Sequence, residues 1–232
     1  MLLINCDLGE HGVANTIDDE LVKYINIANI ACGGHAGDKH SVEYYVNLCN
    51  KFNVKITAHI SYPDKENFGR KVIQIDDASL IESFDEQFKL FDDIKSIKPH
   101  GALYNELNVN EKLAQLFIKW CMQNNISELV LSPNGIVKNI AQASGIKVLN
   151  ESFAERGYML NGKLDPTLIP RGQENAEITN VGDALIQFRQ LNNGYITVDS
   201  KNILFTSETI CIHSDSAIAI DLAKRLYGEI NV

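Results

Sequence analysis

The sequence lacks the features that mark several common classes of protein. Its five cysteines are odd in number and none forms a C-x-x-C pair, which argues against a disulfide framework or a thiolate zinc site. No stretch approaches the ~18 apolar residues of a membrane span. No basic segment precedes the short apolar N-terminus, so no signal peptide is predicted and a cytoplasmic location is expected.

Positive charge is also scarce. The 232 residues include 21 Lys and Arg against 30 Asp and Glu, a formal net charge of −9. Nucleic acids and anionic membranes attract basic faces, so neither is expected as the main partner. With five prolines and no Gly/Ser-rich linker, we predict one domain spanning residues 1–232.

Several catalytic signatures are missing as well. The sequence contains no G-x-x-x-x-G-K-[ST] phosphate loop, and no G-x-G-x-x-G follows a predicted strand. It has neither a G-x-S-x-G elbow nor an H-E-x-x-H helix. A nucleotide-binding fold, a serine hydrolase and a zincin are therefore not indicated.

What the sequence does contain is an alternation of short apolar runs with amphipathic stretches. The runs predict strands at 2–6, 27–32, 54–58, 94–99, 129–131, 147–149 and 209–213. Helices are expected at 18–26, 41–52, 78–93, 111–124, 136–143, 182–192 and 216–227, and a hairpin at 195–198 and 202–205. Alternating strands and helices indicate parallel βαβ units and an α/β fold. Seven strands favour a TIM-like barrel with one irregular unit, and an open doubly wound sheet is the alternative.

Polar residues follow the predicted strands, where parallel α/β folds place their active sites. Four of the six histidines lie there, which favours an enzyme. The residues concerned are Asp7 and Glu10; His35 and Asp38; His59, Asp64 and Arg70; Lys98, His100 and Tyr104; Glu151, Glu155 and Arg156; and His213 and Asp215. Arg171 falls in an irregular stretch, 161–173, which resembles a lid.

Several of these residues also have a purely structural interpretation. Asp38 could cap the helix that begins near residue 39, and Asp7 and Glu10 could cap their loop. Lys98 could be a solvated surface lysine. Arg156 and Arg171 could form exposed ion pairs.

Six segments resemble the LamB/YcsF family, the A subunit of bacterial 5-oxoprolinase, in order along nearly the whole chain. They are 5–10 (NCDLGE), 28–38 (ANIACGGHAGD), 58–64 (AHISYPD), 68–70 (FGR), 98–105 (KPHGALYN) and 170–171 (PR). The resemblance implies an irregular seven-stranded β/α barrel of the glycoside hydrolase/deacetylase type. It also implies ATP-dependent opening of 5-oxoproline to L-glutamate with partner subunits B and C, which would supply much of the ATP site.

On this hypothesis, the catalytic residues are Asp7, Glu10, His35, His59 and His100. The expected substrate-binding residues are Asp38, Asp64, Arg70, Lys98, Tyr104, Glu155, Arg156, Arg171 and His213. A second hypothesis is a metal-dependent amide hydrolase of the carbohydrate-deacetylase type that needs no ATP. Its divalent ion, such as Zn²⁺, would be bound by Asp7, His59 and His100. A third is a non-catalytic binding protein.

Overall fold

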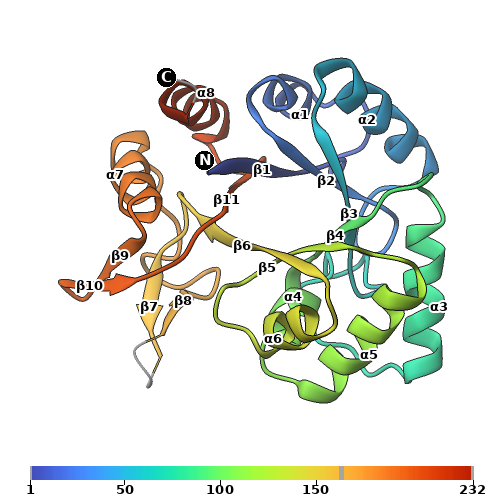
Figure 1. The fold of residues 1–232 in the computed structure, drawn as a ribbon. Helices are drawn as coiled ribbons and strands as arrows, with labels where there is room; N and C mark the ends of the chain where they lie inside the picture. The colour runs from blue at the N-terminus through green and yellow to red at the C-terminus, as the bar shows by residue number, and fades with distance from the viewer. Residues whose placement is uncertain (1, 162–164, 231–232) are drawn as a thin grey trace.

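The structure, a computed structural model, describes residues 2–161 and 165–230 of the chain. Seven parallel strands form a closed barrel in the order β1-β11-β6-β5-β4-β3-β2 (Figure 1). They are β1 (Leu3–Leu8), β2 (Ile27–Ala31), β3 (Lys55–Ile60), β4 (Ser96–Pro99), β5 (Glu128–Leu131), β6 (Lys147–Phe153) and β11 (Thr209–His213). The predicted seven-stranded α/β barrel is confirmed, and the open sheet is excluded because each of the seven strands pairs with two neighbours, which leaves no edge strand in the sheet.

Three strands extend further than the apolar runs predict. β1 continues through Asp7, β3 through His59 and β6 through Glu151. These polar side chains do not end the strands because adjacent strands bond their backbone groups and the barrel interior supplies partners for the side chains. The functional residues therefore lie inside the barrel mouth as well as in the loops after it.

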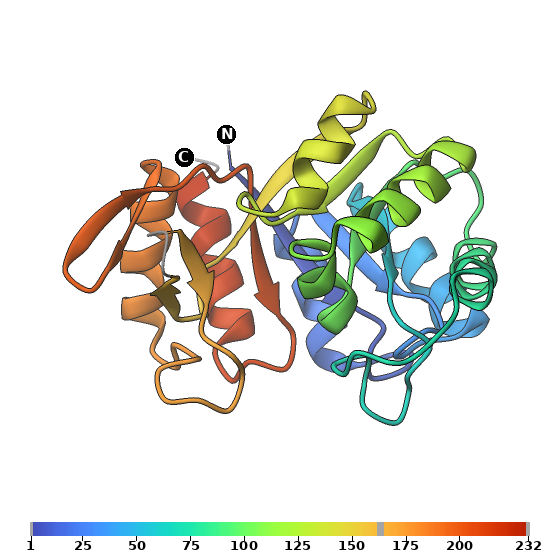
Figure 2. The same cartoon turned by 90° about the horizontal axis from the view of Figure 1, so that it is seen from below.

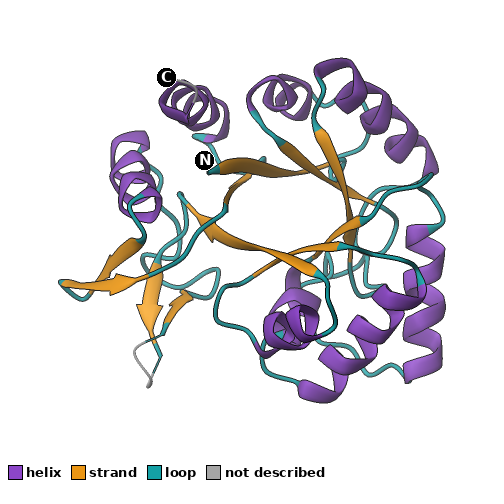
Figure 3. Ribbon diagram, in the orientation of Figure 1, coloured by secondary structure: helices purple, strands orange, loops and turns teal. Residues whose placement is uncertain are grey.

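Helices cover the outside of the barrel (Figure 3). They are α1 (Thr16–Leu21) with the short η1 (Val22–Tyr24), α2 (Lys39–Phe52), α3 (Asp77–Phe88), α4 (Gly101–Leu107), α5 (Glu111–Gln123), α6 (Ile136–Ala143), α7 (Val181–Asn192) and α8 (Ala219–Ile230). The predicted helix at 78–93 is too long, since α3 ends at Phe88. The short helix α4, which directly follows β4, was not expected. None of these helices is long and apolar enough to cross a membrane.

The irregular unit lies between β6 and β11. Here the chain forms two antiparallel hairpins, β7 (Tyr158–Leu160) with β8 (Pro166–Leu168), and β9 (Tyr195–Val198) with β10 (Lys201–Leu204). The second hairpin was predicted, and its turn residues Asp199 and Ser200 both have positive φ, as a type I′ hairpin turn requires. Figure 2 shows that α7 and the β9–β10 hairpin project on one side of the barrel.

An ion cluster lies at the amino-terminal end of the barrel. Glu128 of β5 forms ion pairs with Lys55 and Lys147, and its carboxylate also accepts a hydrogen bond from Ser96. Burial alone would raise the pKa of Glu128, but the two lysines outweigh it and lower the pKa. This cluster lies at the opposite ends of the strands from Asp7, His59 and Glu151.

Candidate functional site

A cavity of about 610 Å³ is lined by side chains from the carboxyl ends of the barrel strands. Ten of the predicted site residues line it: Asp7, Glu10, His59, Arg70, Lys98, His100, Tyr104, Arg156, Arg171 and His213. Glu151 lines it too. Glu151 was among the polar residues near the end of the sixth predicted strand, but no catalytic or binding role was predicted for it.

Lys98 lies at the bottom of this cavity between two carboxylates. Its side-chain nitrogen is 2.8 Å from Asp7 Oδ1 and 2.8 Å from Glu151 Oε1, and the residue is 3% exposed. The surface interpretation of Lys98 is therefore wrong. Burial alone would lower the pKa of Lys98, but Asp7, Cys211 and Glu151 raise it well above the usual range. The ammonium group is thus charged and bound to protein carboxylates.

Asp7 is the other centre of this network. Asn29 donates a hydrogen bond of 2.8 Å to Asp7 Oδ1, and His59 Nε2 is 3.3 Å from Asp7 Oδ2. Burial would raise the pKa of Asp7, but His59 and Lys98 together lower it well below its usual range. Asp7 is therefore ionised at neutral pH and has an oxygen directed toward the histidines. Nothing in the sequence identifies Asn29, a buried asparagine within β2, as a partner of Asp7.

Three histidines from neighbouring strand ends pack together. The His35 and His100 rings are parallel with centroids 3.6 Å apart, and His59 is perpendicular to both. His35 donates a hydrogen bond of 2.9 Å to Glu10 Oε1. Burial and the neighbouring histidines lower the pKa of His35 and of His100 well below the usual range. Both rings are therefore neutral near pH 7.

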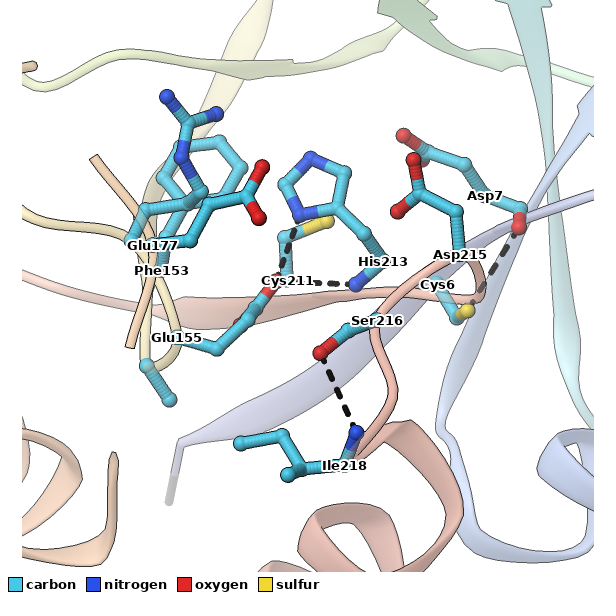
Figure 4. A network of polar contacts seen from close by, with 12 residues as sticks. Cys6, Asp7, Phe153, Glu155, Glu177, Cys211, His213, Asp215, Ser216 and Ile218 are labelled. Atoms are coloured by element: carbon cyan, nitrogen blue, oxygen red, sulfur yellow. Dashed lines mark hydrogen bonds and ion pairs between the residues drawn. The ribbon is translucent and has the colours of Figure 1, made fainter. Parts of the chain in front are cut away.

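His213 stands on the other side of the cavity and is held by Glu155. The Glu155 carboxylate accepts hydrogen bonds from the His213 ring at 2.6 Å and from its backbone N–H at 3.0 Å (Figure 4). The Phe153 ring stacks on the imidazole at a centroid distance of 5.4 Å. Glu155 is buried beneath His213 and is not among the residues that line the cavity, so it positions the histidine.

Arginines surround the cavity entrance. Arg156 donates to the backbone carbonyls of Ala176 and Ile169, which holds the segment that covers one side of the cavity. Arg70 and Arg171 both approach the Asp215 carboxylate, at 3.7 and 3.6 Å. The lid predicted for this region thus corresponds to an ordered segment fixed by Arg156. Residues 162–164 of the predicted stretch lie outside the part of the chain that the structure describes.

Besides Glu155, two more predicted substrate-binding residues do not line the cavity. The Asp38 carboxylate accepts a hydrogen bond from the Ser41 backbone N–H at 2.9 Å and caps α2, as its structural interpretation predicts. Asp64 accepts hydrogen bonds from the backbone and side chain of Asn67 and so stabilises its own loop. Both carboxylates are engaged within the protein because each lies at a turn with free backbone N–H groups.

The fold and site together define a β/α-barrel protein with a cavity of carboxylates, histidines and cations at the carboxyl ends of its strands. Residues 2–232 match the model of the LamB/YcsF family, and the chain belongs to this family. It is 33% identical to the A subunit of 5-oxoprolinase from Histophilus somni (98% of this chain, 94% of the relative). It is 30% identical to that of Corynebacterium jeikeium (98% and 92%).

Solved structures share the fold. The lactam utilization protein from Thermus thermophilus superposes with a TM-score of 0.84 at 23% identity, over 99% of this chain and 96% of that one. An uncharacterized protein from Agrobacterium tumefaciens superposes with a TM-score of 0.63 at 9% identity, over 100% and 85%.

Proposed function

We propose that this chain is the A subunit of a 5-oxoprolinase and that, with partner subunits B and C, it converts 5-oxoproline to L-glutamate while ATP becomes ADP and phosphate. The relatives that carry the name of this subunit match nearly the whole chain at 30–33% identity. The observation that carries the proposal is the convergence of an ionised Asp7, neutral histidines and arginines in one cavity. This set suits hydrolysis of a small anionic amide.

Coupling to ATP fits the chemistry of a lactam. A ring amide resists water at neutral pH, and transfer of the ATP terminal phosphoryl group to the carbonyl oxygen makes its carbon electrophilic. Water then adds to that carbon, the ring C–N bond breaks and the nitrogen takes up a proton. A second water cleaves the resulting acyl phosphate to glutamate and phosphate. Subunits B and C supply the activation in this scheme, since this chain has no phosphate-loop motif.

The ring-opening step uses the histidine side of the cavity. Asp7, ionised and held by Lys98, orients the attacking water, and His59, 3.3 Å from Asp7, takes up the proton of this water. That proton then passes to the departing nitrogen, and His100, which also lines the cavity, is the alternative carrier. Lys98 acts through Asp7 instead of binding the substrate carboxylate, because both of its short contacts are with protein carboxylates.

In this scheme the arginines bind negative charge. Arg70 and Arg171 both approach Asp215, Arg171 also pairs with Glu177, and a guanidinium group offers two parallel donors to a carboxylate or phosphate. Tyr104 remains a neutral hydroxyl donor in the cavity, because burial and Glu151 raise its pKa well above the usual range. The substrate carboxylate and the transferred phosphate are thus assigned to the entrance side of the cavity.

The test is glutamate release from 5-oxoproline by the three reconstituted subunits, with and without ATP. Asp7→Asn and His59→Ala should each lower kcat by about 10²-fold or more. Asp38→Ala, which removes a helix cap outside the cavity, is the matched control and should leave kcat and KM unchanged. Full turnover in both cavity variants would overturn the site assignment.

A metal-dependent amide hydrolase is a second candidate, favoured by the histidine and carboxylate cluster near Asp7. It differs from the first in needing neither ATP nor partner subunits. Deacetylation of an N-acetylated sugar by the isolated chain without ATP, and its loss in the presence of EDTA, would support it. ATP-dependent glutamate release that needs all three subunits would exclude it.

A further inference from the structure

Three polar atoms, from Glu10, His59 and His100, converge on one point of the cavity wall, and Asp7 approaches this point beside His59. His59 Nε2 is 3.0 Å from His100 Nδ1, 3.3 Å from Asp7 Oδ2 and 3.8 Å from Glu10 Oε1. His100 Nδ1 is 3.4 Å from Glu10 Oε1. All four residues line the cavity.

The outer hydrogen bonds of the two histidines fix which ring nitrogen carries the proton. His59 Nδ1 is 3.0 Å from the Lys98 carbonyl oxygen, and His100 Nε2 is 2.9 Å from the Phe68 carbonyl oxygen. A carbonyl oxygen only accepts, so both of these nitrogens are N–H donors. In the neutral rings, His59 Nε2 and His100 Nδ1 therefore carry lone pairs, and these lone pairs face each other at 3.0 Å.

The two carboxylates add to the repulsion between these lone pairs. Glu10 Oε1 faces the same point, and Asp7 Oδ2 faces His59 Nε2. Glu10 Oε1 accepts a hydrogen bond from His35 on its other side, but with both rings neutral no hydrogen lies between the acceptors that face one another, and they repel. A positive species at the centre removes the repulsion, and it is either a proton shared by the rings or a metal ion.

We propose that Glu10, His59 and His100 form a site for one divalent metal ion of the zinc class. Zn²⁺ binds histidine nitrogen and carboxylate oxygen at about 2.0–2.2 Å, so neighbouring ligand atoms of a tetrahedral site lie about 3.4 Å apart. The distances of 3.0, 3.4 and 3.8 Å between the three ligand atoms bracket that value. A proton on one of the rings would also attract the carboxylates, so metal titration of the isolated chain is the measurement that separates the two.

His35 belongs to the same cluster but has a different role. Its ring is parallel to that of His100 at 3.6 Å, and a metal ion lies in the plane of the imidazole that binds it. One ion cannot lie in two parallel planes separated by the thickness of a ring. His35 instead donates to Glu10 Oε1 at 2.9 Å, so it is a positioning residue that orients a metal-binding carboxylate.

A metal ion here would polarise a carbonyl oxygen or lower the pKa of a water molecule in the cavity. This catalytic use rests on the proposed function, whereas metal binding does not. The site can therefore be tested on the isolated chain without turnover. If metal binds but the reconstituted subunits release no glutamate, the proposed function fails and the metal site stands.

The experiment starts from the unaltered chain, stripped of metal with a chelator. Zn²⁺ is titrated calorimetrically, and Co²⁺ is followed by its visible absorption, which reports coordination geometry. We expect one ion per chain and the intense visible bands of a four- or five-coordinate Co²⁺ site. Absence of stoichiometric binding by the unaltered chain would refute the site outright, whatever the variants do.

Variants then locate the ion. Glu10→Gln and His100→Gln should each weaken Zn²⁺ binding by more than 100-fold. His35→Gln should weaken it by about 10–100-fold, because Glu10 loses the hydrogen bond that orients it. His40→Gln, which changes an exposed histidine on α2, is the matched control and should bind like the unaltered chain.

A rival cluster lies across the cavity at Asp7, Cys211 and His213. Loss of binding in His213→Gln, with binding retained in His100→Gln, would place the ion there and overturn the proposal. Circular dichroism and thermal unfolding of each variant separate loss of the ligand from loss of the fold.

Discussion

Lys98 provides the sharpest test of how the cavity is stabilised. Its ammonium group is 3% exposed and lies 2.8 Å from both Asp7 and Glu151. Lys98→Met keeps the length of the side chain and removes the charge, so two buried carboxylates lose their shared counterion. Removing one partner of a buried ion pair typically costs about 3–5 kcal/mol, because the remaining charge stays buried. We expect a loss of this size in the free energy of unfolding.

Urea denaturation at pH 7, followed by circular dichroism, measures this loss. With an m-value of about 3 kcal/mol/M, the midpoint should fall by roughly 1–2 M. The control is Lys224→Met, which removes a lysine on α8 that is 45% exposed and pairs with Glu20. An exposed pair of this kind contributes about 0–1 kcal/mol, so the control should barely move the midpoint.

A double variant identifies the cause. In Lys98→Met combined with Glu151→Gln, one of the two orphaned charges is absent, so about 1–2 kcal/mol of the loss should be recovered, within the range of measured coupling energies. The reasoning is refuted if Lys98→Met alone costs less than about 1 kcal/mol, the upper end for an exposed pair. It is equally refuted if the Lys98 and Glu151 effects simply add, since additivity means that the two side chains do not interact.

The remaining predictions concern stability away from the cavity. Asp38→Ala should lower the free energy of unfolding by about 1 kcal/mol through loss of the α2 cap. KM in the reconstituted assay should not change, and a raised KM would show that Asp38 binds substrate after all. Gly37→Ala should lower the free energy of unfolding by about 2 kcal/mol or more, because φ is +77° and an added Cβ would lie 2.3 Å from a backbone carbonyl oxygen. Gly228→Ala, in open space on α8, should instead raise it by about 0.5–1 kcal/mol, and equal effects of the two variants would contradict the argument. Glu128→Gln should destabilise at neutral pH by about 1–2 kcal/mol. Because the folded pKa of Glu128 is lowered, its contribution is present above the unfolded value and disappears as pH falls through the folded pKa; urea midpoints of the two proteins should converge in acid, and a constant gap would refute this assignment.

The barrel and the position of its site could be predicted from local patterns. Parallel strands that close into a barrel bring their carboxyl ends to one mouth. Polar residues near the ends of different strands, such as Asp7, His59, Lys98 and His213, must then lie close together. The register of the structure places Asp7 beside His213 and His59 beside Lys98. Strand position alone was enough to identify the cavity.

The depth and partners of each side chain could not be predicted in the same way. Lys98 looks like a free cation in the sequence, because its partner Glu151 is more than fifty residues away and meets it only across the closed barrel. Asp38 follows a strand as His35 does, yet one residue caps a helix and the other contacts Glu10. Such choices depend on long-range packing. The short helix α4 and the three-residue strands of β7 and β8 have too few residues to show a period.

The placement of charge explains how an acidic chain can present cations to an anionic substrate. Lys98 is not available, because Asp7 and Glu151 already neutralise it. Arg70 is held only loosely, 3.7 Å from the Asp215 carboxylate, whereas Arg171 lies between Asp215 and Glu177 at 3.6 and 3.1 Å. These ion pairs are partly exposed and therefore weak, so either guanidinium group can exchange its partner for an anionic ligand despite a net charge of −9. A carboxylate or phosphate is consequently attracted by these two side chains and not by the overall field of the protein.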